Sequence, residues 1–514
     1  MFSCITSGTV CGLTSFLIRV EVDMSPGLPC LVMVGRLSSE VKESGERVRV
    51  ALKNSGFQLP PLHIAVNLSP ADIRKSGTAF DLPLALAILS ALGKIPEDAL
   101  TKTLVLGELG LNGEIKEVTG VLPILWEAFK KGYEHAVIPD GNRAEGLLVE
   151  GMFVGAFKNL RDIIEILRKD KREMANFFVK NSTPPLEKKE DFPEERMDFS
   201  QVRGQEQLKR GAVIAAAGFH HMLLVGPPGS GKTMIASRLP TIMPELSFEE
   251  SMEITSIYSI AGELKKEEPL IVKRPFLSPH HTCSTYALAG GGRVPKPGYV
   301  SLAHRGVLFL DELPEFGRQT IDLLRQPLEE KVIHLVRTTG TYHYPADFQL
   351  LAAMNPCPCG FYPNTQKCSC TPSQIHKYAG NISGPILDRI DLCLTARKLE
   401  VEALQGPSVG LSSAQMREMV SKARNFQQKR YEGKGVRFNS ELRDKELEMY
   451  CTLDAKEKRF MEKMYEKCNL TARSYHKLLR VARTIADLDE SENIKQEHLA
   501  EAICYRPYGG NLYE

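Results

Sequence analysis

The stretch GPPGSGKT, residues 226–233, follows a short apolar run at 222–225 and precedes the helix-like segment MIASRL. A strand, a loop of the form GxxxxGK[ST] and a helix in this order are typical of a phosphate-binding loop. Glycine lets backbone N–H groups approach a phosphate closely, and the helix N-terminus favours an anion. We expect ATP and Mg²⁺ here, because Lys232 offers a charge to the terminal phosphates and Thr233 a hydroxyl to the metal ion. The residues predicted to hold the nucleotide are Gly226, Pro227, Pro228, Gly229, Ser230, Gly231, Lys232 and Thr233.

A second apolar run, VLFL at 307–310, ends in two acidic residues about 80 residues after the loop. An acidic pair at the end of a buried strand is typical of a Walker B motif. Asp311 is predicted to hold Mg²⁺, and Glu312 to orient and deprotonate the water that attacks ATP. A third apolar run, 348–354, ends in Asn355, whose amide is able to hold that water against the γ-phosphate. An asparagine that only caps a turn is the alternative for Asn355.

Two arginines are candidates for contacts with the transferred phosphate. The segment ILDRIDL places Arg389 between two aspartates, which predicts either a local salt bridge or an arginine finger that reaches the nucleotide of a neighbouring subunit. Such a finger raises turnover by roughly 10³–10⁵. Arg473 opens an amphipathic helix, where the helix dipole disfavours a cation. A contact with the γ-phosphate, the sensor-2 role, would explain this position, and Arg480 is the competing candidate.

Six stretches together resemble the magnesium-chelatase-like branch of AAA+ ATPases, and more closely the YifB/ComM family. They are GPPGSGKT, RPFLSPHHTCST at 274–285, GVLFLDELPEF at 306–316, AAMNPCPCG at 352–360, GPILDRIDL at 384–392 and TARSYHKLLRVARTIADL at 471–488. The resemblance implies an α/β fold, with a P-loop AAA+ core on a parallel sheet and a C-terminal helical lid. It also implies a bacterial cytoplasmic protein that assembles as a homo-oligomeric ring, expected to be a hexamer. ComM members are similar to helicases that drive branch migration of recombining DNA during natural transformation, so DNA is the expected partner.

The same branch implies two insertions in the core. The segment SFEE, 247–250, predicts a capping box at a helix start, and about 45 residues separate that helix from the Walker B run. This is longer than an ordinary connection and fits an insert aimed at a ring pore; its His280 and His281 are assigned no chemistry. Runs at 332–337 and 341–344 predict a hairpin. In related ring motors such hairpins grip the strand in the channel, with Lys331 and Arg337 as the basic candidates here, and a solvated hairpin is the alternative.

The first block resembles the Lon-protease proteolytic fold. In Lon, a serine lies in a GPSAG segment and a lysine in GGLKEK. The matching stretches here are GTAFD, 77–81, and GEIKEV, 113–118, which hold Ala79 and Val118 at those two positions. Neither side chain is able to act as a nucleophile or a base, so we expect no peptidase activity. The domain is instead expected to bind a partner or nucleic acid, or to stiffen a ring.

Four cysteines lie within fourteen residues: Cys357, Cys359, Cys368 and Cys370. This spacing is close enough for one tetrahedral metal site, and the intervening GFYPNTQK is able to fold back. The pairs are CxC rather than the commoner CxxC. We expect structural zinc that braces the loop after Asn355, and four free thiols are the alternative.

Length and composition divide the 514 residues into several domains. We expect a Lon-like domain at 1–165, a linker at 166–197, the AAA+ core at 198–397, the helical lid at 398–506 and a tail at 507–514. In the first domain, 16–22 and 63–68 alternate as strands do, and 81–92 predicts a helix with Leu82, Leu86 and Leu89 on one face. The net charge of +2 argues against an overall basic surface. The start of the chain has no basic leader and no apolar run is long enough to span a bilayer, so we expect a cytoplasmic protein without a membrane contact.

One segment of the lid, 421–438, is rich in basic and aromatic residues. It holds Lys422, Arg424, Lys429, Arg430, Lys434 and Arg437 with Phe426, Tyr431 and Phe438 between them. Such a mixture suits phosphate contact and base stacking, and a solvated helix face is the alternative.

The sequence is therefore compatible with three functions. The first is an ATP-driven motor that moves along DNA, the second a chelatase-type ATPase that remodels a protein partner, and the third an ATP-dependent assembly platform. The Lon-like domain and the cysteines argue against the second, since chelatase motor subunits resemble this chain only over the AAA+ part. The acidic pair and Arg389 argue against the third.

Overall fold

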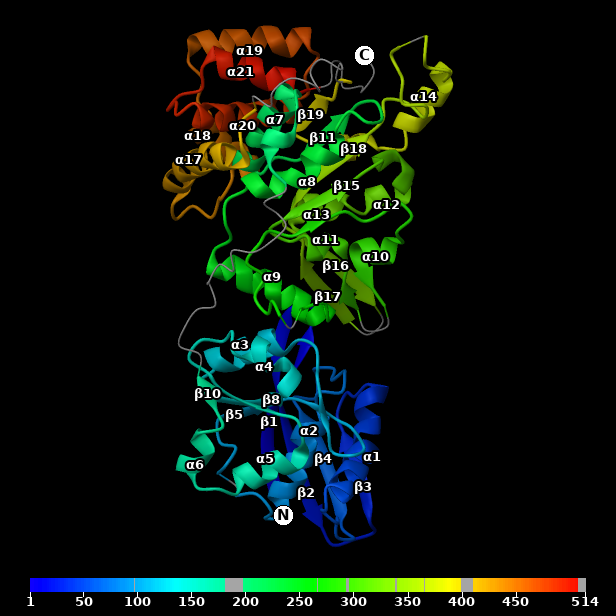
Figure 1. Cartoon of the computed structure of the whole chain (residues 1–514), viewed down its shortest axis with the longest axis vertical. Coiled ribbons are helices and arrows are strands. Elements are labelled where there is room, and N and C mark those ends of the chain that lie inside the picture. The colour runs from blue at the N-terminus through cyan, green and yellow to red at the C-terminus, as the bar shows by residue number, and fades with distance from the viewer. Residues whose placement is uncertain are drawn as a thin grey trace.

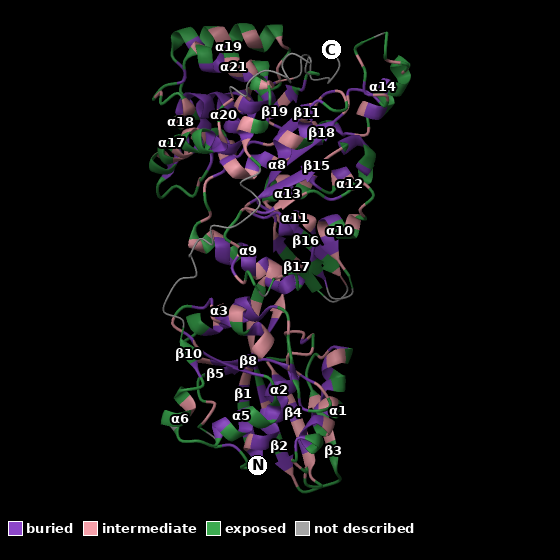
Figure 2. Cartoon of the chain, viewed as in Figure 1, coloured by how far each residue is buried: buried purple, intermediate pink, exposed green. Residues whose placement is uncertain are grey.

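The computed structural model describes residues 1–96, 98–180, 197–265, 267–292, 295–337, 340–364, 366–398 and 410–506. Figure 1 shows an elongated molecule with the first domain at one end, a second α/β domain in the middle and a group of helices at the other end. The buried residues gather in the strands of both sheets and in the helices packed on them (Figure 2). No helix of the described residues is long and apolar enough to cross a membrane.

An eight-stranded sheet organises the first domain, in the order β10-β9-β8-β5-β1-β2-β4-β3. Its strands are β1 (Phe2–Cys11), β2 (Thr14–Ser25), β3 (Cys30–Val34), β4 (His63–Ser69), β5 (Thr103–Val105), β8 (His135–Pro139), β9 (Phe153–Phe157) and β10 (Val179–Lys180). A separate pair is formed by β6 (Glu108–Leu109) and β7 (Ile115–Lys116), and the helices are α1 (Ser39–Asn54), α2 (Asp81–Ala91), α3 (Val121–Lys130), α4 (Arg143–Gly146), α5 (Leu160–Leu167) and α6 (Lys171–Ala175). The predicted strands at 16–22 and 63–68 are confirmed as parts of β2 and β4.

Helix α2 differs from its prediction. The sequence predicted one apolar face, whereas every residue of α2 except Ser90 is buried. The helix packs against β1 and β2 on one side and against α1 on the other, so apolar residues cover its whole circumference. Its one charged residue, Asp81, is neutralised by Arg47 at 2.8 Å.

The first domain also extends further along the chain than the sequence indicated. Strand β10 pairs antiparallel with β9, and the buried Phe178 joins the core of this domain. These residues fall within the expected linker at 166–197, whose remaining part from 181 to 196 lies outside the described residues. The polar composition of this stretch concealed the few apolar residues that extend the sheet.

A parallel five-stranded sheet forms the second domain, in the order β12-β15-β18-β11-β19. Its strands are β11 (Met222–Val225), β12 (Phe276–Leu277), β15 (Val307–Leu310), β18 (Gln349–Met354) and β19 (Leu392–Thr395), and helices α7 (Glu206–Gly218) and α8 (Lys232–Ile242) pack on it. The three apolar runs of the sequence are confirmed as β11, β15 and β18, which are neighbours in the sheet. Because parallel strands end at the same edge, the phosphate-binding loop, the acidic pair and Asn355 meet there.

The C-terminal region is helical, as expected. It contains α17 (Ser413–Tyr431), α18 (Asp444–Tyr450), α19 (Ala455–Lys467), α20 (Ala472–Leu488) and α21 (Gln496–Cys504). The amphipathic helix predicted to start at Arg473 is confirmed as α20, where Leu478, Leu479, Ala482, Ile485 and Ala486 are buried and Tyr475 is partly buried. One hydrophobic core runs from the sheet through α7 into these helices. The tail at 507–514 lies outside the described residues.

Both expected insertions are present between α8 and β18. Ser247 caps α9 (Phe248–Ala261) in a capping box with Glu250, as predicted. The insert that follows contains α10 (Thr285–Ala289), β13 (Gly290–Gly291), β14 (Lys296–Pro297) and α11 (Tyr299–Leu302). The predicted hairpin is confirmed as β16 (Val332–Arg337) paired with β17 (Gly340–Pro345), and it follows α13 (Arg325–Glu330). Its turn residues Thr338 and Thr339 lie outside the described residues.

The first domain rests on these insertions (Figure 1). Helix α3 packs against α9, and Met252 joins the hydrophobic cluster of the first domain. At the β1–β2 turn, a Cβ on Gly12 would lie 2.8 Å from the backbone oxygen of His343 in β17, so only glycine fits this close approach. Across the junction, the hydroxyl of Ser259 in α9 donates to the buried carboxylate of Glu145.

Candidate active site

The phosphate-binding loop follows β11 and leads into α8. Gly229 and Gly231 have φ angles of +72° and +85°, a conformation that favours glycine. A Cβ on Gly226 would lie 2.4 Å from the backbone oxygen of Ala396 after β19, so the first position of the motif also requires glycine. The loop therefore takes the open, left-handed turns that leave its N–H groups able to face an anion.

Lys232 is held in place beneath this loop. Its Nζ donates to the carbonyl oxygens of Gly226 at 2.7 Å and Pro227 at 3.0 Å, and to Oδ1 of Asn355 at 3.2 Å. Burial lowers the pKa of Lys232, and the nearby carboxylates of Asp311 and Glu312 oppose that shift. The start of α8 and the end of β18 thus bring the lysine and Asn355 together, as the sequence predicted for residues of one site.

The acidic pair faces the start of α8. The hydroxyl of Thr233 donates to Oδ2 of Asp311 at 2.9 Å, and the N–H of Glu312 donates to Oδ1 of Asp311 at 2.9 Å. Glu312 has a φ of +52°, which is unusual for a residue with a Cβ and is typical of strained positions at functional sites. A hydroxyl and a carboxylate that converge in this way are the hard oxygen ligands that Mg²⁺ prefers.

These residues line a cavity of about 410 Å³. Its walls are the residues from Pro228 to Met234, the pair Asp311 and Glu312, and Met354 with Asn355. A cation, backbone donors and oxygen ligands therefore surround one space, which fits the triphosphate of ATP with Mg²⁺.

His281 is a contact of Glu312 that the sequence did not reveal. Its Nδ1 lies 3.4 Å from Oε2 of Glu312, and its ring lies 4.1 Å from that of His280. His281 comes from the insert after β12, about 30 residues before the acidic pair in the chain. The motif RPFLSPHHTCST was the only signal in the sequence, and nothing in it indicated which side chain the histidines would meet.

Arg389 and Arg473 lie together but away from this cavity. Both donate to Oε1 of Glu329 in α13, Arg389 at 2.5 Å and Arg473 at 2.8 Å. The local salt bridge that the sequence offered for Arg389 is not formed with Asp391, because that carboxylate accepts from His220 at 3.3 Å instead. Neither arginine is among the described residues that line the phosphate cavity of its own chain. The competing Arg480 donates to the backbone oxygen of Ser440 at 3.0 Å.

The four cysteines after Asn355 converge on one point. The Sγ atom of Cys357 lies 3.3 Å from that of Cys359 and 3.7 Å from that of Cys368, and all four sulfurs, including that of Cys370, lie within 4.8 Å of one another. A tetrahedral zinc ion with bonds of about 2.3 Å separates its sulfur ligands by about 3.8 Å. A backbone N–H of Phe361 lowers the pKa of Cys359, whereas hydrogen bonds among the clustered thiols raise the pKa of Cys368 and Cys370, so the fit to a metal rests on the positions of the four sulfurs. The cluster therefore fits zinc.

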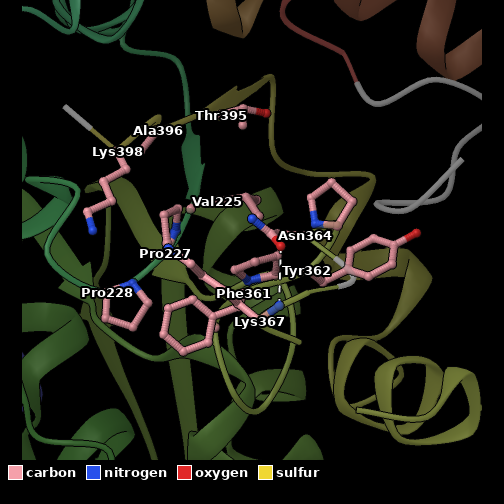
Figure 3. A pocket seen from close by; sticks show the side chains of 14 residues that line it. Val225, Pro227, Pro228, Phe361, Tyr362, Asn364, Lys367, Thr395, Ala396 and Lys398 are labelled. Atoms are coloured by element: carbon pink, nitrogen blue, oxygen red, sulfur yellow. Dashed lines mark hydrogen bonds between the residues drawn. The ribbon is translucent and has the colours of Figure 1, made fainter. Parts of the chain in front are cut away.

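The cysteine loop also forms a wall beside the phosphate-binding loop (Figure 3). Phe361 and Tyr362 of this loop face Pro227 and Pro228 across a cavity of about 730 Å³, which the end of β19 closes on another side. A Cβ on Gly360 would lie 2.5 Å from Cδ of Pro228, so the two loops touch directly. The conformation of the cysteine loop thus affects the shape of the nucleotide site.

Purified protein is expected to contain about one zinc ion per chain, since four thiols meet at one tetrahedral point. The double variant Cys359→Ser/Cys368→Ser should lose the metal, and the ATPase rate should fall because the wall beside the phosphate-binding loop loosens. Elemental analysis checks the first result, with the exposed Cys504→Ser as the matched control. Wild-type protein free of zinc under non-chelating conditions would contradict the site.

The basic segment 421–438 makes its contacts within the chain. Arg430 pairs with Asp487 at 2.5 Å, Arg437 pairs with Asp347 at 2.5 Å, and Arg424 stacks 3.8 Å from the ring centroid of Phe438. Tyr431 and Phe438 are buried as well. Arg424, Arg430, Tyr431 and Phe438 are thus engaged within the chain and are not available to nucleic acid, whereas Arg437 is exposed beside its partner Asp347. The predictions of a nucleic-acid surface or a solvated face still apply to the exposed residues of the segment, which include Lys422, Phe426, Lys429 and Lys434.

In the first domain, the two positions at which Lon has catalytic residues lie in an apolar environment. Ala79 and Val118 pack against the hydrophobic cluster that contains Leu106 and Val121. The nearby Lys75 is fully buried and donates to the backbone oxygen of Pro70. Burial lowers the pKa of this lysine.

Comparison with known proteins supports these features over nearly the whole chain. Residues 198–404 match the family model for magnesium chelatase, subunit ChlI, residues 20–142 a model for subunit ChlI of Mg-chelatase, and residues 410–506 a model for the C-terminal part of ChlI. The competence protein ComM of Haemophilus influenzae is 42% identical over 96% of this chain and 95% of its own length. The protein YifB of Escherichia coli is 41% identical over 95% of this chain and 94% of its own length.

The fold and the phosphate cavity, together with these matches, define a magnesium-chelatase-like AAA+ ATPase. More specifically, the chain belongs to the YifB/ComM family. Its N-terminal α/β domain is weakly similar to Lon: Lon protease 2 of Bacillus subtilis is 30% identical over 28% of this chain and 26% of its own length.

Proposed function

We propose that this protein is an ATP-driven ring motor that acts on DNA. The proposal depends on the point where the two insertions meet, at the exposed ring of Tyr286 and the guanidinium of Arg337. The phosphate cavity supports ATP hydrolysis, and the matched magnesium-chelatase family is typically oligomeric. The relative from Haemophilus influenzae is a competence protein, which supports a role with DNA.

In this proposal, hydrolysis depends on side chains from three neighbouring strands. Lys232 places its charge at the terminal phosphates, and Thr233 with Asp311 supplies the oxygen ligands for Mg²⁺, which neutralises phosphate charge when bound. Glu312 takes a proton from water as the water oxygen bonds to the γ-phosphorus and the bond to the ADP oxygen breaks. Asn355 orients that water, and His281, 3.4 Å from Glu312, holds the carboxylate in place.

The arginine pair completes the site of a neighbouring subunit. Arg389 and Arg473 share one carboxylate and lie away from the phosphate cavity of their own chain, so we infer that both serve the same nucleotide across a subunit junction. Charge from an arginine at the transferred phosphate is a recurring element of such enzymes.

The strand is proposed to contact the two insertions where they meet. Tyr286 of α10 is 65% exposed, and the guanidinium of Arg337 in β16 lies 5.8 Å from its ring centroid. Gly291 lies beneath them, where a Cβ would be 2.7 Å from the tyrosine ring and 3.1 Å from the arginine. An exposed aromatic face beside a cation suits base stacking with phosphate contact. The other basic candidate, Lys331, pairs with Glu441 and Asp347 and is not proposed as a strand contact.

The test is the ATPase rate on a panel of linear, forked and four-way DNA. We expect stimulation by DNA, and we expect Tyr286→Ala and Arg337→Ala to weaken DNA binding, with about 1–3 kcal/mol lost for the stacking residue. Tyr286→Phe retains the ring and should bind as the wild type does. Unchanged hydrolysis on every DNA would contradict the DNA motor, and stimulation by an unfolded polypeptide instead would favour a protein-remodelling ATPase.

A further inference from the structure

Glu329 joins two arginines that come from distant parts of the chain. Arg389 lies just after α15 (Gly384–Leu387), and Arg473 lies in the first turn of α20, yet both donate to the same oxygen of Glu329. Two guanidinium groups side by side repel each other unless an anion lies between them. Contact with Arg389, and then with Arg473, lowers the pKa of Glu329, so the carboxylate stays charged.

Both arginines keep donors for a further anion. A guanidinium carries five N–H donors. Within the described residues, Arg389 uses Nη2 on Glu329 and Nη1 on the backbone oxygen of Pro385, and each of these nitrogens carries a second hydrogen. Arg473 uses Nη2 on Glu329. Glu329 therefore fixes the direction of the pair without occupying the donors that a phosphate oxygen would take.

The turn that carries Arg389 is itself fixed to α20. The buried Lys477 donates to the backbone oxygens of Ile390 at 2.8 Å and Leu387 at 3.4 Å. Arg389 and Arg473 are thus attached to one body, and Glu329 approaches that body from α13.

Glu329 also lies at the base of the hairpin. It is the penultimate residue of α13, and β16 begins three residues later. The neighbouring Glu330 contacts His334 of β16 at 3.3 Å. A displacement of the hairpin therefore moves the end of α13 and, with it, the carboxylate between the two arginines.

We propose that Glu329 is a positioning residue, which holds Arg389 and Arg473 as a pair for the neighbouring subunit's nucleotide and passes movement of the hairpin to that pair. The inference rests on the proposed function, because it takes the pair to act across a subunit junction. Removal of Glu329 should misdirect the arginines in the transition state without emptying the nucleotide site.

The first experiment is steady-state ATPase kinetics with and without DNA. Glu329→Ala is expected to lower kcat by up to about 10²-fold, as for misplaced groups in general, with KM for ATP within about twofold of wild type and a smaller stimulation by DNA. Glu329→Gln keeps a hydrogen-bond acceptor, so its kcat should lie between those of the wild type and of Glu329→Ala. Glu466→Gln, at an exposed position of α19, is the control and should behave as wild type. A wild-type kcat in Glu329→Ala, or a raised KM with kcat unchanged, would overturn the role.

The second experiment separates this inference from the proposed function. Glu329→Ala and Arg389→Ala are each mixed with Lys232→Ala, whose own arginine pair is intact. Both mixtures should hydrolyse ATP faster than the sum of their separate components. A gain with Arg389→Ala but not with Glu329→Ala overturns the role of Glu329 alone, whereas no gain with either overturns the inter-subunit site and the inference with it. Sedimentation velocity confirms that the variants assemble, and Glu329→Gln replaces the alanine variant if that one does not.

Discussion

Glu312→Gln is expected to lower the rate of ATP hydrolysis by about 10²–10⁴, because glutamine cannot accept the proton of the attacking water. Binding of ATP should persist, since Lys232, Thr233 and Asp311 are untouched and glutamine has almost the same shape as glutamate. The ring should therefore accumulate in a nucleotide-loaded state. Phosphate release measures the first effect, and retention of labelled ATP on the assembled protein measures the second.

A matched control for this variant lies three residues along the chain. Glu315 is exposed and follows the same strand, in the short helical turn Leu313–Phe316, so Glu315→Gln should hydrolyse ATP at the wild-type rate. A Glu312→Gln protein that still hydrolyses ATP as fast as the wild type would show that another group is the base.

Arg389→Ala is expected to reduce turnover by about 10³–10⁵, the range for loss of an arginine that stabilises charge on the transferred phosphate. Nucleotide affinity should change little, because Arg389 is not among the described residues that line the phosphate cavity of its own chain. Mixing this variant with Lys232→Ala should restore part of the activity, since some junctions then pair an intact loop with an intact arginine. The rate of phosphate release at several mixing ratios measures the effect.

The exposed Arg459 in α19 is a suitable control, and Arg459→Ala should keep wild-type turnover. If Arg389→Ala regains nothing on mixing, the arginine is structural, with its role confined to the ion pair with Glu329.

The sequence predicted the central sheet and the phosphate cavity because their chemistry is local. The loop, the acidic pair and Asn355 each follow an apolar strand, and parallel strands bring such positions to one edge without any further information. The capping box at Ser247 and the hairpin were predictable for the same reason, since both depend on residues close together in the chain.

The remaining features depend on partners that are far apart in the sequence. Nothing near Arg389 indicated that Glu329, sixty residues earlier, would take it in preference to the adjacent aspartates. The contact between His281 and Glu312 arises only when β12 and β15 pair. The arginines of the segment 421–438 looked available because their counter-charges, Asp347 and Asp487, lie elsewhere in the chain.

The junction between the first domain and α9 couples the two domains mechanically. Its polar centre is Glu145, whose pKa is raised by burial, and apolar residues of both domains surround it. Uncovering such a surface is costly, so the first domain follows α9 as a rigid attachment. In the proposed ring motor, an ATP-driven movement of the insertion would therefore reach both the DNA proposed to contact Tyr286 and Arg337 and any partner bound to the first domain.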